Sequence, residues 1–523
     1  MQASCSESGG ELLPRDDARP ESPLEAEAQN GQPAGPAPWQ RLTNRQIDNT
    51  LRDLFGEPFA LAQERLSPEG RGDSGFATPG VVTTVDVDRF GALATAVAEK
   101  VGPKLAQGQL LPCDPAAGEE ACARAFIEAF APRAFRRPVA ADEVTDLLAV
   151  YTAARGDGGQ DFAGGMKLLV AAILQAPPFL YHMEALPDAP IPEEGKVVPF
   201  GPYELASRLS YFLIDTLPDE ALLQAAAEGR LQTEDDLERE ARRLLDLPLA
   251  EEAIWSFGVQ WLGIGKLPTL PKTAPVFTAE MKTSALAETR AFLKRMMLGD
   301  GDTKTLFTAP YSLVDERLAQ LYGVPDVKGT ELVEKAVEHR AGILTHASVL
   351  ATYAAGDNDE PITRGKLVRE AFLCQSLPPP PPNIPTLPKV DGNATNRQRH
   401  EQHMTTEPCK SCHMLMDPLG FGLGHFDGVG RYRTQEGTAA VDARGLVTNI
   451  DRQEKSFTGA IELGRILAES DEVRRCVMKK AFRFAFGRGE TGGDAPALES
   501  TYATYEASGF KLKELLVAVV RSR

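Results

Sequence analysis

The amino-acid sequence predicts a mostly α-helical protein made of several modules. The chain has 523 residues, which at about 150 residues per domain is enough for three or four domains. Apolar residues recur at helical spacing from about residue 39 onward. A run of five prolines, Pro378 to Pro382, separates a long helical part from a shorter C-terminal part. We expect a multi-module helical bundle protein with modules at residues 39–110, 111–195, 196–330, 331–435 and 436–523.

Residues 1–38 precede the first expected helix and are rich in Pro, Glu, Gly and Ala. They contain too little apolar surface to offset the entropy of ordering, so we expect a disordered tether. Within it, small residues before Cys5 resemble the end of a bacterial lipoprotein signal, although the charged and apolar parts of a signal peptide are not present. We therefore treat Cys5 as a lipidation candidate whose signal lies upstream. The alternative is an ordinary cysteine in a tail.

The first expected helix begins after Trp39. Thr43 or Asn44 can cap it, Ile47 and Leu51 lie on one face, and Gly56 ends it. The same reasoning applies to later stretches. These contain the pairs Phe126 and Phe130, Val144 and Tyr151, and Leu205 and Leu213, and the residues that follow Pro218.

The C-terminal part begins with the proline run, which is expected to form a stiff polyproline II spacer before residue 400. A short β-hairpin is expected around Asp442-Ala-Arg-Gly445. Two further helices are expected to close the chain, from Val473 to Phe484 and from Leu512 to Val519. The protein is thus expected to be helical apart from one short hairpin.

Composition and charge exclude some classes of partner. The hydrophobic content of 42% is ordinary for a globular protein, and no stretch approaches the ~20 apolar residues of a membrane span. The net charge of -18 argues against nucleic acid or an anionic membrane surface as a partner. We therefore expect no nucleic-acid partner, and membrane contact only through a lipid anchor. No Ser/His/Asp, HExxH or nucleotide-binding pattern indicates a particular reaction.

The strongest functional motif is Cys409-Lys410-Ser411-Cys412-His413. Two cysteines three apart, with a histidine directly after the second, are the spacing that attaches a c-type haem. The thiols lie about one helical turn apart and can bond to one porphyrin edge, and His413 becomes the proximal iron ligand. A CxxC pair also occurs as half of a zinc site or as a redox dithiol. We expect one covalent haem c in a small segment near the C-terminus.

The second axial ligand is not determined by the sequence. The candidates are His403, His425, His346 and Met478, although His403 is close to Cys409 in sequence. Two protein ligands would favour electron transfer, whereas an open site would allow ligand chemistry. A glycine-rich loop follows the motif and suits a chain that wraps a porphyrin.

Charged residues of this loop are candidates for contact with the haem. Arg431 and Arg433 follow the glycines and could neutralise a haem propionate. Asp427 could orient one of these arginines. The alternative is a surface salt bridge of at most about 1 kcal/mol.

The remaining cysteines can form two disulfides. Cys113 and Cys122 flank an acidic loop, and Cys374 and Cys476 can join two segments distant in sequence. Each bond would stabilise the fold by about 2–4 kcal/mol and would imply an oxidising compartment. The alternative is four free buried thiols.

The order of these features resembles a multi-module family of proteins of unknown function that is frequent in planctomycetes and myxobacteria. Members combine several domains of unknown function with one haem-c motif. The matching landmarks are residues 41–56, 133–138, 204–213 and 218–220, Arg364-Gly365, Leu377, His403, the CxxCH motif, residues 417–421, Phe426-Asp427 and residues 430–433. The resemblance implies secretion, often with lipid anchoring, and a haem held by Cys409, Cys412 and His413. It implies no defined activity.

We therefore expect an extracytoplasmic c-type haem protein, in the periplasm or at the cell surface. Its expected role is single-electron transfer to a redox partner that the sequence does not identify, with residues 39–375 as a docking or substrate-binding body. One alternative is a haem-dependent oxidoreductase. Another is a surface-anchored binding or scaffold protein with a structural zinc or a vestigial haem site.

Overall fold

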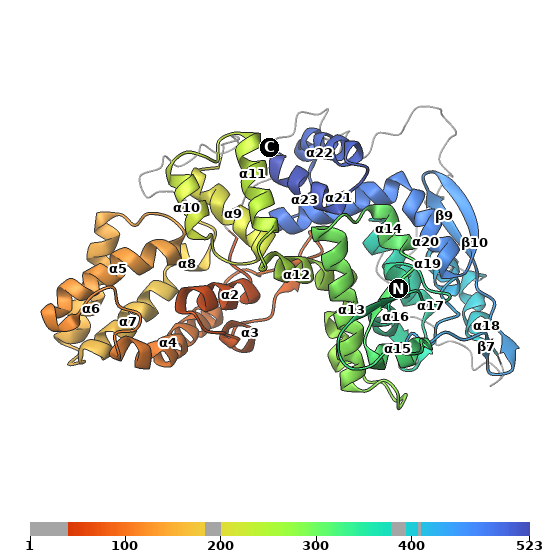
Figure 1. Cartoon of the computed structure of the whole chain (residues 1–523), viewed down its shortest axis with the longest axis horizontal. Helices are drawn as coiled ribbons and strands as arrows, with labels where there is room; N and C mark the ends of the chain where they lie inside the picture. The colour runs from red at the N-terminus through yellow and green to blue at the C-terminus, as the bar shows by residue number, and fades with distance from the viewer. Residues whose placement is uncertain (1–39, 184–199, 378–393, 406–408, 523) are drawn as a thin grey trace, which may run out of the picture.

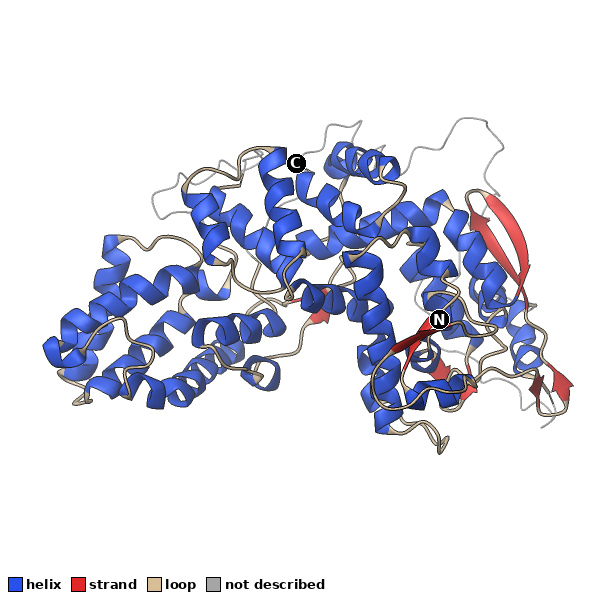
Figure 2. Ribbon diagram, viewed as in Figure 1, coloured by secondary structure: helices blue, strands red, loops and turns tan. Residues whose placement is uncertain are grey.

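The computed structural model describes residues 40–183, 200–377, 394–405 and 409–522. This part of the chain is mostly helical, and its strands form only short two-stranded antiparallel sheets (Figure 2). The predicted fold class is therefore confirmed. The predicted tether at 1–38, the lipidation candidate Cys5 and the proline spacer at 378–382 lie outside the described residues. Each helix among those residues is too short or too polar to span a bilayer.

The N-terminal helices form a smaller body with its own hydrophobic core. Thr43 caps its first helix through a reciprocal contact with Gln46, and Gly56 ends that helix with φ 69°. The sequence prediction for this helix is thus confirmed. The helices of this body are α2 (Asn44–Phe55), α3 (Leu61–Arg65), α4 (Thr84–Ala106), α5 (Glu119–Phe135), α6 (Ala141–Arg155), α7 (Phe162–Gln175) and α8 (Pro177–Leu180), with strands β1 (Gly70–Arg71) and β2 (Ala77–Thr78) and the short turn η1 (Pro115–Ala117).

The rest of the chain forms a larger body (Figure 1). Its first half contains helices α9 (Pro202–Ile214), α10 (Glu220–Ala227), α11 (Glu234–Leu245), α12 (Ala250–Leu262), α13 (Ala279–Leu298), α14 (Thr303–Thr308), α15 (Glu316–Tyr322), α16 (Ala347–Thr352) and α17 (Pro361–Leu367). It also contains the 3-10 helices η2 (Ile264–Thr269) and η3 (Ile343–Thr345), the π-helix η4 (Val368–Phe372), and strands β3 (Ser312–Val314), β4 (Val333–Lys335), β5 (Ala354–Ala355) and β6 (Asn358–Asp359). Its second half contains helices α18 (Asn396–His400), α19 (Lys410–Phe421), α20 (Gly459–Glu469), α21 (Asp471–Phe486), α22 (Ala495–Ala507) and α23 (Leu512–Arg521), turns η5 (Glu401–Met404) and η6 (Gly492–Asp494), and strands β7 (Gln435–Glu436), β8 (Ala439–Ala440), β9 (Arg444–Ile450) and β10 (Gln453–Thr458).

One large hydrophobic core runs through this body from α9 to α23. The last helix, α23, packs against α11, and Arg242 and Arg521 form ion pairs with Glu514 and Glu238 at 2.6 and 2.8 Å. The three expected modules between residues 196 and 523 therefore share their apolar interior.

The C-terminal hairpin lies slightly later than predicted. β9 and β10 pair antiparallel, and Ile450 faces Gln453 across a two-residue turn. Asp451 and Arg452 form this turn with φ 48° and 62°, the left-handed conformation that a tight hairpin turn requires. The expected position at 442–445 was wrong because Asp-Arg lacks the glycine that usually marks such a turn.

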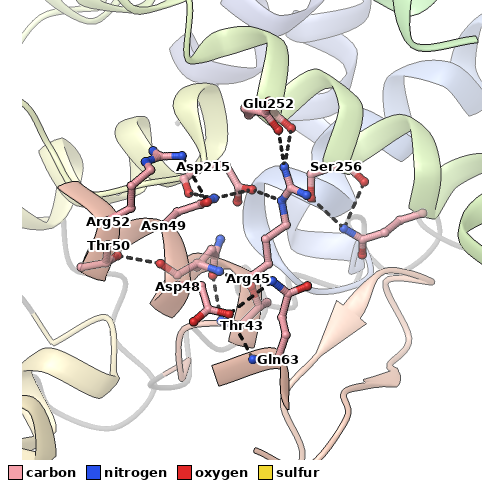
Figure 3. Close-up of polar contacts among 12 residues, drawn as sticks. Thr43, Arg45, Asp48, Asn49, Thr50, Arg52, Gln63, Asp215, Glu252 and Ser256 are labelled. Atoms are coloured by element: carbon pink, nitrogen blue, oxygen red, sulfur yellow. Dashed lines mark hydrogen bonds and ion pairs between the residues drawn. The ribbon is translucent and has the colours of Figure 1, made fainter. Parts of the chain in front are cut away.

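The two bodies are joined by polar contacts around α2 (Figure 3). Arg45 on α2 contacts Asp215 at the end of α9 at 2.7 Å and Glu252 on α12 at 2.9 Å. Asn49 donates a hydrogen bond to the backbone oxygen of Asp215 at 2.9 Å. Burial raises the pKa of Asp215 to about 6, although Arg45 favours its charged form. These contacts fix the smaller body against α9 and α12.

Buried Glu288 on α13 gives the fold a pH dependence. Tyr322 donates a hydrogen bond to one carboxylate oxygen of Glu288 at 2.7 Å, and the other carboxylate oxygen has no partner among the residues that the structure describes. Burial raises the pKa of Glu288 to about 7. A raised folded pKa adds stability that is complete below the unfolded value of 4.5 and is lost by pH 7. Glu288→Gln should therefore remove about 3 kcal/mol of this pH dependence. Urea unfolding of both proteins at pH 4.5 and 8 checks this. If the free energy of unfolding depended equally on pH in the wild-type protein and in Glu288→Gln, Glu288 would not be neutral in the folded protein.

Candidate metal centre

The CxxCH residues lie at the start of helix α19. Cys409 already has helical backbone angles, φ −66° and ψ −35°, and the His413 N–H donates to the Cys409 carbonyl at 3.1 Å. The helical register therefore places Cys409, Cys412 and His413 within about one turn. Both thiols are free and partly exposed. The geometry thus keeps the two thiols available for bonding near one end of the helix.

Two glycines set the position of α19 against α17. A Cβ atom on Gly365 would lie 1.9 Å from the Met416 carbonyl oxygen, and one on Gly420 would lie 1.9 Å from the Pro361 carbonyl oxygen. The backbones of the two helices therefore touch at points where no larger residue fits. Arg369 adds a hydrogen bond to the Leu415 carbonyl at 2.9 Å. This crossing fixes the direction in which α19 presents His413.

Asp417 holds the imidazole of His413. Nδ1 of His413 lies 2.9 and 3.1 Å from the two carboxylate oxygens of Asp417, which is fully buried one turn later on α19. The carboxylate therefore accepts the Nδ1 proton and leaves Nε2 for another group. A carboxylate that accepts the Nδ1 proton in this way is typical of metal-binding histidines. This role of Asp417 was not predicted from the sequence, although its four-residue spacing from His413 on a helix was the available signal.

His403 lies beside His413. The ring centroids are 4.5 Å apart, and Nδ1 of His403 is buried without a hydrogen-bond partner among the described residues. Ligand atoms of His403, His413 and Asp417 all lie within 4.8 Å of one another. Burial and then the nearby His413 lower the pKa of His403, which favours its neutral form. A neutral, unpartnered imidazole is suited to bind a metal.

His400 continues this group of histidines. Its ring lies 6.2 Å from that of His403, its Nδ1 donates to the Asn396 carbonyl at 2.8 Å, and its Nε2 lies 3.3 Å from a Glu360 oxygen. Burial lowers the pKa of His400, but the contacts with Glu360 and Asn396 outweigh this effect and raise it. Both ring nitrogens are therefore engaged, and His400 supports the centre from one side.

The other predicted axial ligands lie elsewhere. His346 is buried, its Nδ1 lies 3.0 Å from the Thr289 hydroxyl, and burial lowers its pKa to about 3. His425 donates from Nδ1 to the Arg433 carbonyl at 2.9 Å, and Met478 lies in the large hydrophobic core. These contacts occupy one ring nitrogen of His346 and one of His425, and they place Met478 among apolar side chains. Of the four candidates, His403 is the one that the structure brings to His413.

The glycine-rich loop after α19 also differs from expectation. Cβ atoms on Gly428 and Gly430 would lie 2.2 Å from the Asp357 carbonyl carbon and 3.0 Å from the Ala347 Cα. The glycines therefore serve close packing of protein on protein, where a porphyrin wrap was expected.

The two arginines of the loop pair with carboxylates. Arg433 binds Asp359 at 2.6 Å, and the more exposed Arg431 binds Asp427 at 3.0 Å. Both guanidinium groups therefore have carboxylate partners, and the contact of either with a haem propionate stays a prediction.

The four remaining described cysteines form two disulfides. Cys113 bonds to Cys122, and Cys374 bonds to Cys476 across 102 residues of sequence. These are the pairs that the spacing suggested. The second bond joins the end of η4 to α21, so it links the segment before the proline run to the C-terminal helices.

The residues present fit a c-type haem. Two free thiols at the start of α19 and a histidine with Nε2 available are the groups that attach such a haem and bind its iron. The buried carboxylate on Nδ1 fixes the orientation of that histidine. A zinc ion would need the thiols and imidazoles to converge. Among the described residues, the group of converging ligand atoms contains His403, His413 and Asp417 but neither cysteine. The fit to zinc is therefore incomplete.

Fold and site together define a multi-module helical protein with a CxxCH-bearing helix. Five family models match it, each described as a protein of unknown function: DUF1587 at 40–102, DUF1595 at 122–184, DUF1592 at 200–324, DUF1588 at 340–436 and DUF1585 at 453–523. The chain belongs to the planctomycete cytochrome-c-like multi-domain family of proteins of unknown function. No curated protein and no solved structure matches the chain.

Proposed function

We propose that this chain is a c-type haem protein that carries single electrons. The observation that supports this most is the His413–Asp417 contact at 2.9 Å beside two free cysteines on the first turn of the same helix. When bound, the haem supplies a one-electron iron couple. Cys409 and Cys412 would hold it covalently, and His413 would bind it through Nε2.

His403 is proposed as a second residue that would hold the metal. Its buried Nδ1 has no partner in the described part of the chain, and its ring lies 4.5 Å from that of His413. Two histidine ligands close the metal to substrates and favour electron transfer over ligand chemistry. The haem-dependent oxidoreductase is therefore the less supported alternative.

An extracytoplasmic location is part of this proposal. Two disulfides, one of them between distant segments, are favoured in oxidising compartments. Covalent haem attachment to CxxCH takes place outside the cytoplasm as well. Lipid anchoring through Cys5 remains a prediction, and so does the redox partner.

A second candidate is a metal site without haem, in a binding or scaffold protein. The cluster of His403, His413 and Asp417 within 4.8 Å supports it. Zinc found in stoichiometric amount by metal analysis of exported protein, with no haem, would favour this candidate.

A redox titration tests the proposed function. Protein exported with covalent haem should show one reversible one-electron step, followed by its visible spectrum. Asp417→Asn should raise the midpoint potential, because the buried carboxylate stabilises the more positive ferric state. A tenfold change in the equilibrium between the ferric and ferrous states corresponds to about 60 mV for one electron. A haem that no donor reduces across a wide potential range would contradict electron transfer.

A further inference from the structure

A cavity of about 350 Å³ lies where the two bodies meet, away from α19. The β1–β2 hairpin of the smaller body contributes Arg71, the end of α12 and η2 contribute Gln260 and Lys266, and Tyr353 follows α16. The cavity is open to solvent and its volume is in the range of small-molecule sites. Its lining residues come from three segments that are distant in sequence.

The cavity carries positive charge in a chain with a net charge of -18. Arg71 and Lys266 both line it, and neither forms an ion pair within the described ranges. The Arg71 guanidinium is fixed by donating to the Gln260 backbone oxygen at 3.0 Å. Two unpaired cations held at one cavity form an anion-binding arrangement.

Charges around the cavity leave this arrangement positive. Lys480 lies near Arg71, and burial together with Arg483 lowers its pKa to about 8. Two acids act on Lys480: Glu490, which pairs with Arg483 at 2.6 Å, and Glu370, which also acts on Tyr353. The Glu370 carboxylate lies 3.6 Å from the Lys366 ammonium, which balances its charge.

Tyr353 and the helix end beneath it give the cavity a fixed apolar wall. The Tyr353 hydroxyl donates to the Leu262 carbonyl at 2.9 Å, and the Lys266 ammonium lies 5.2 Å from the centre of its ring. Gly263 has φ 63°, and a Cβ there would lie 2.5 Å from the Tyr353 hydroxyl. The ring is therefore held in one orientation beside the cations, and Val259 adds further apolar surface.

We propose that this cavity binds a small organic carboxylate, whose anionic group contacts Arg71 and Lys266 and whose apolar body packs against Tyr353 and Val259. A planar carboxylate matches the fork of an arginine side chain, and a lysine adds a point charge. The site is separate from the CxxCH centre and does not depend on haem.

Isothermal titration of the full chain with benzoate tests this site. Benzoate combines a carboxylate with a ring and should bind saturably, whereas benzyl alcohol, which lacks the charge, should not. Lys266→Gln and Arg71→Gln should each weaken benzoate binding about tenfold, the value of one charge-assisted contact. Because the Lys266 ammonium makes no hydrogen bond to the described residues, its substitution should leave the fold intact. Lys328→Gln, a strongly exposed lysine on the loop after α15, serves as the control and should bind benzoate normally.

Two results would overturn the proposal. One is the absence of saturable benzoate binding, and the other is equal binding by Lys266→Gln, Arg71→Gln and the Lys328→Gln control. Tighter binding of inorganic phosphate than of benzoate would replace the carboxylate by a phosphate ligand. The same titration on Cys409→Ala/Cys412→Ala protein should give the same affinity, so a failure of the haem proposal leaves this test unaffected.

Discussion

Arg364→Met is expected to unfold the segment that carries the CxxCH helix. The Arg364 side chain is fully buried on α17, and burial lowers its pKa to about 10. Its guanidinium donates to the carbonyls of Leu350, Tyr353, Leu423, Phe426 and Asp427. Methionine fills a similar volume but removes these donors from the five buried carbonyls. Leu423 and Asp427 each keep one backbone donor, whereas each acceptor left without a donor costs about 1–3 kcal/mol. We expect a loss of about 5 kcal/mol in the free energy of unfolding, measured by urea denaturation.

Arg431→Met is the matched control for this experiment. Arg431 lies on the loop after α19 that Arg364 contacts, its side chain is 58% exposed, and its ion pair with Asp427 is 3.0 Å long. An exposed pair of this kind contributes at most about 1 kcal/mol. If both variants lost equally little stability, Arg364 would not organise the loop after α19.

His403→Ala is expected to change the ligation of the haem iron. In the wild-type protein, His413 and His403 together should give a low-spin visible spectrum that carbon monoxide alters slowly. Alanine removes the buried imidazole next to His413 and should give a high-spin spectrum and rapid carbon monoxide binding. Absorbance and stopped-flow measurements on reduced, haem-loaded protein follow both properties.

His425→Ala is the control for that prediction. His425 was also a candidate ligand, but its Nδ1 donates to the Arg433 carbonyl and its ring stacks on Tyr432 at 5.3 Å. Its substitution should leave the spectrum unchanged. A low-spin spectrum that survives in His403→Ala would show that another residue binds the iron.

Local features of the fold were predictable from the sequence because their causes are local. Thr43, Gln46 and Gly56 mark the ends of α2 through capping contacts within one turn. The CxxCH spacing likewise places its residues within one turn of a helix. The hairpin was predicted but misplaced, since Asp451 and Arg452 adopt left-handed angles that glycine or asparagine would normally signal.

Contacts between distant segments were not predictable from residue patterns alone. The sequence does not show that Gly365 and Gly420 mark a helix crossing, nor that His346 and Met478 are buried. The composition of the glycine-rich loop suits either a contact with a porphyrin or a close backbone contact. In the structure, the glycines of this loop lie close to the backbone of other segments. Asp417 begins the 417–421 landmark that the sequence showed, but its role required the geometry of the folded helix.

A pyridine haemochrome spectrum of exported protein tests directly whether the chain carries a covalent haem. The protein should be produced in cells that mature c-type cytochromes, with Cys409→Ala/Cys412→Ala as the control. The account predicts one covalently bound haem per chain, and its loss in the control. Protein that carries zinc and no covalent haem would contradict the claim and leave a structural metal site at His403 and His413.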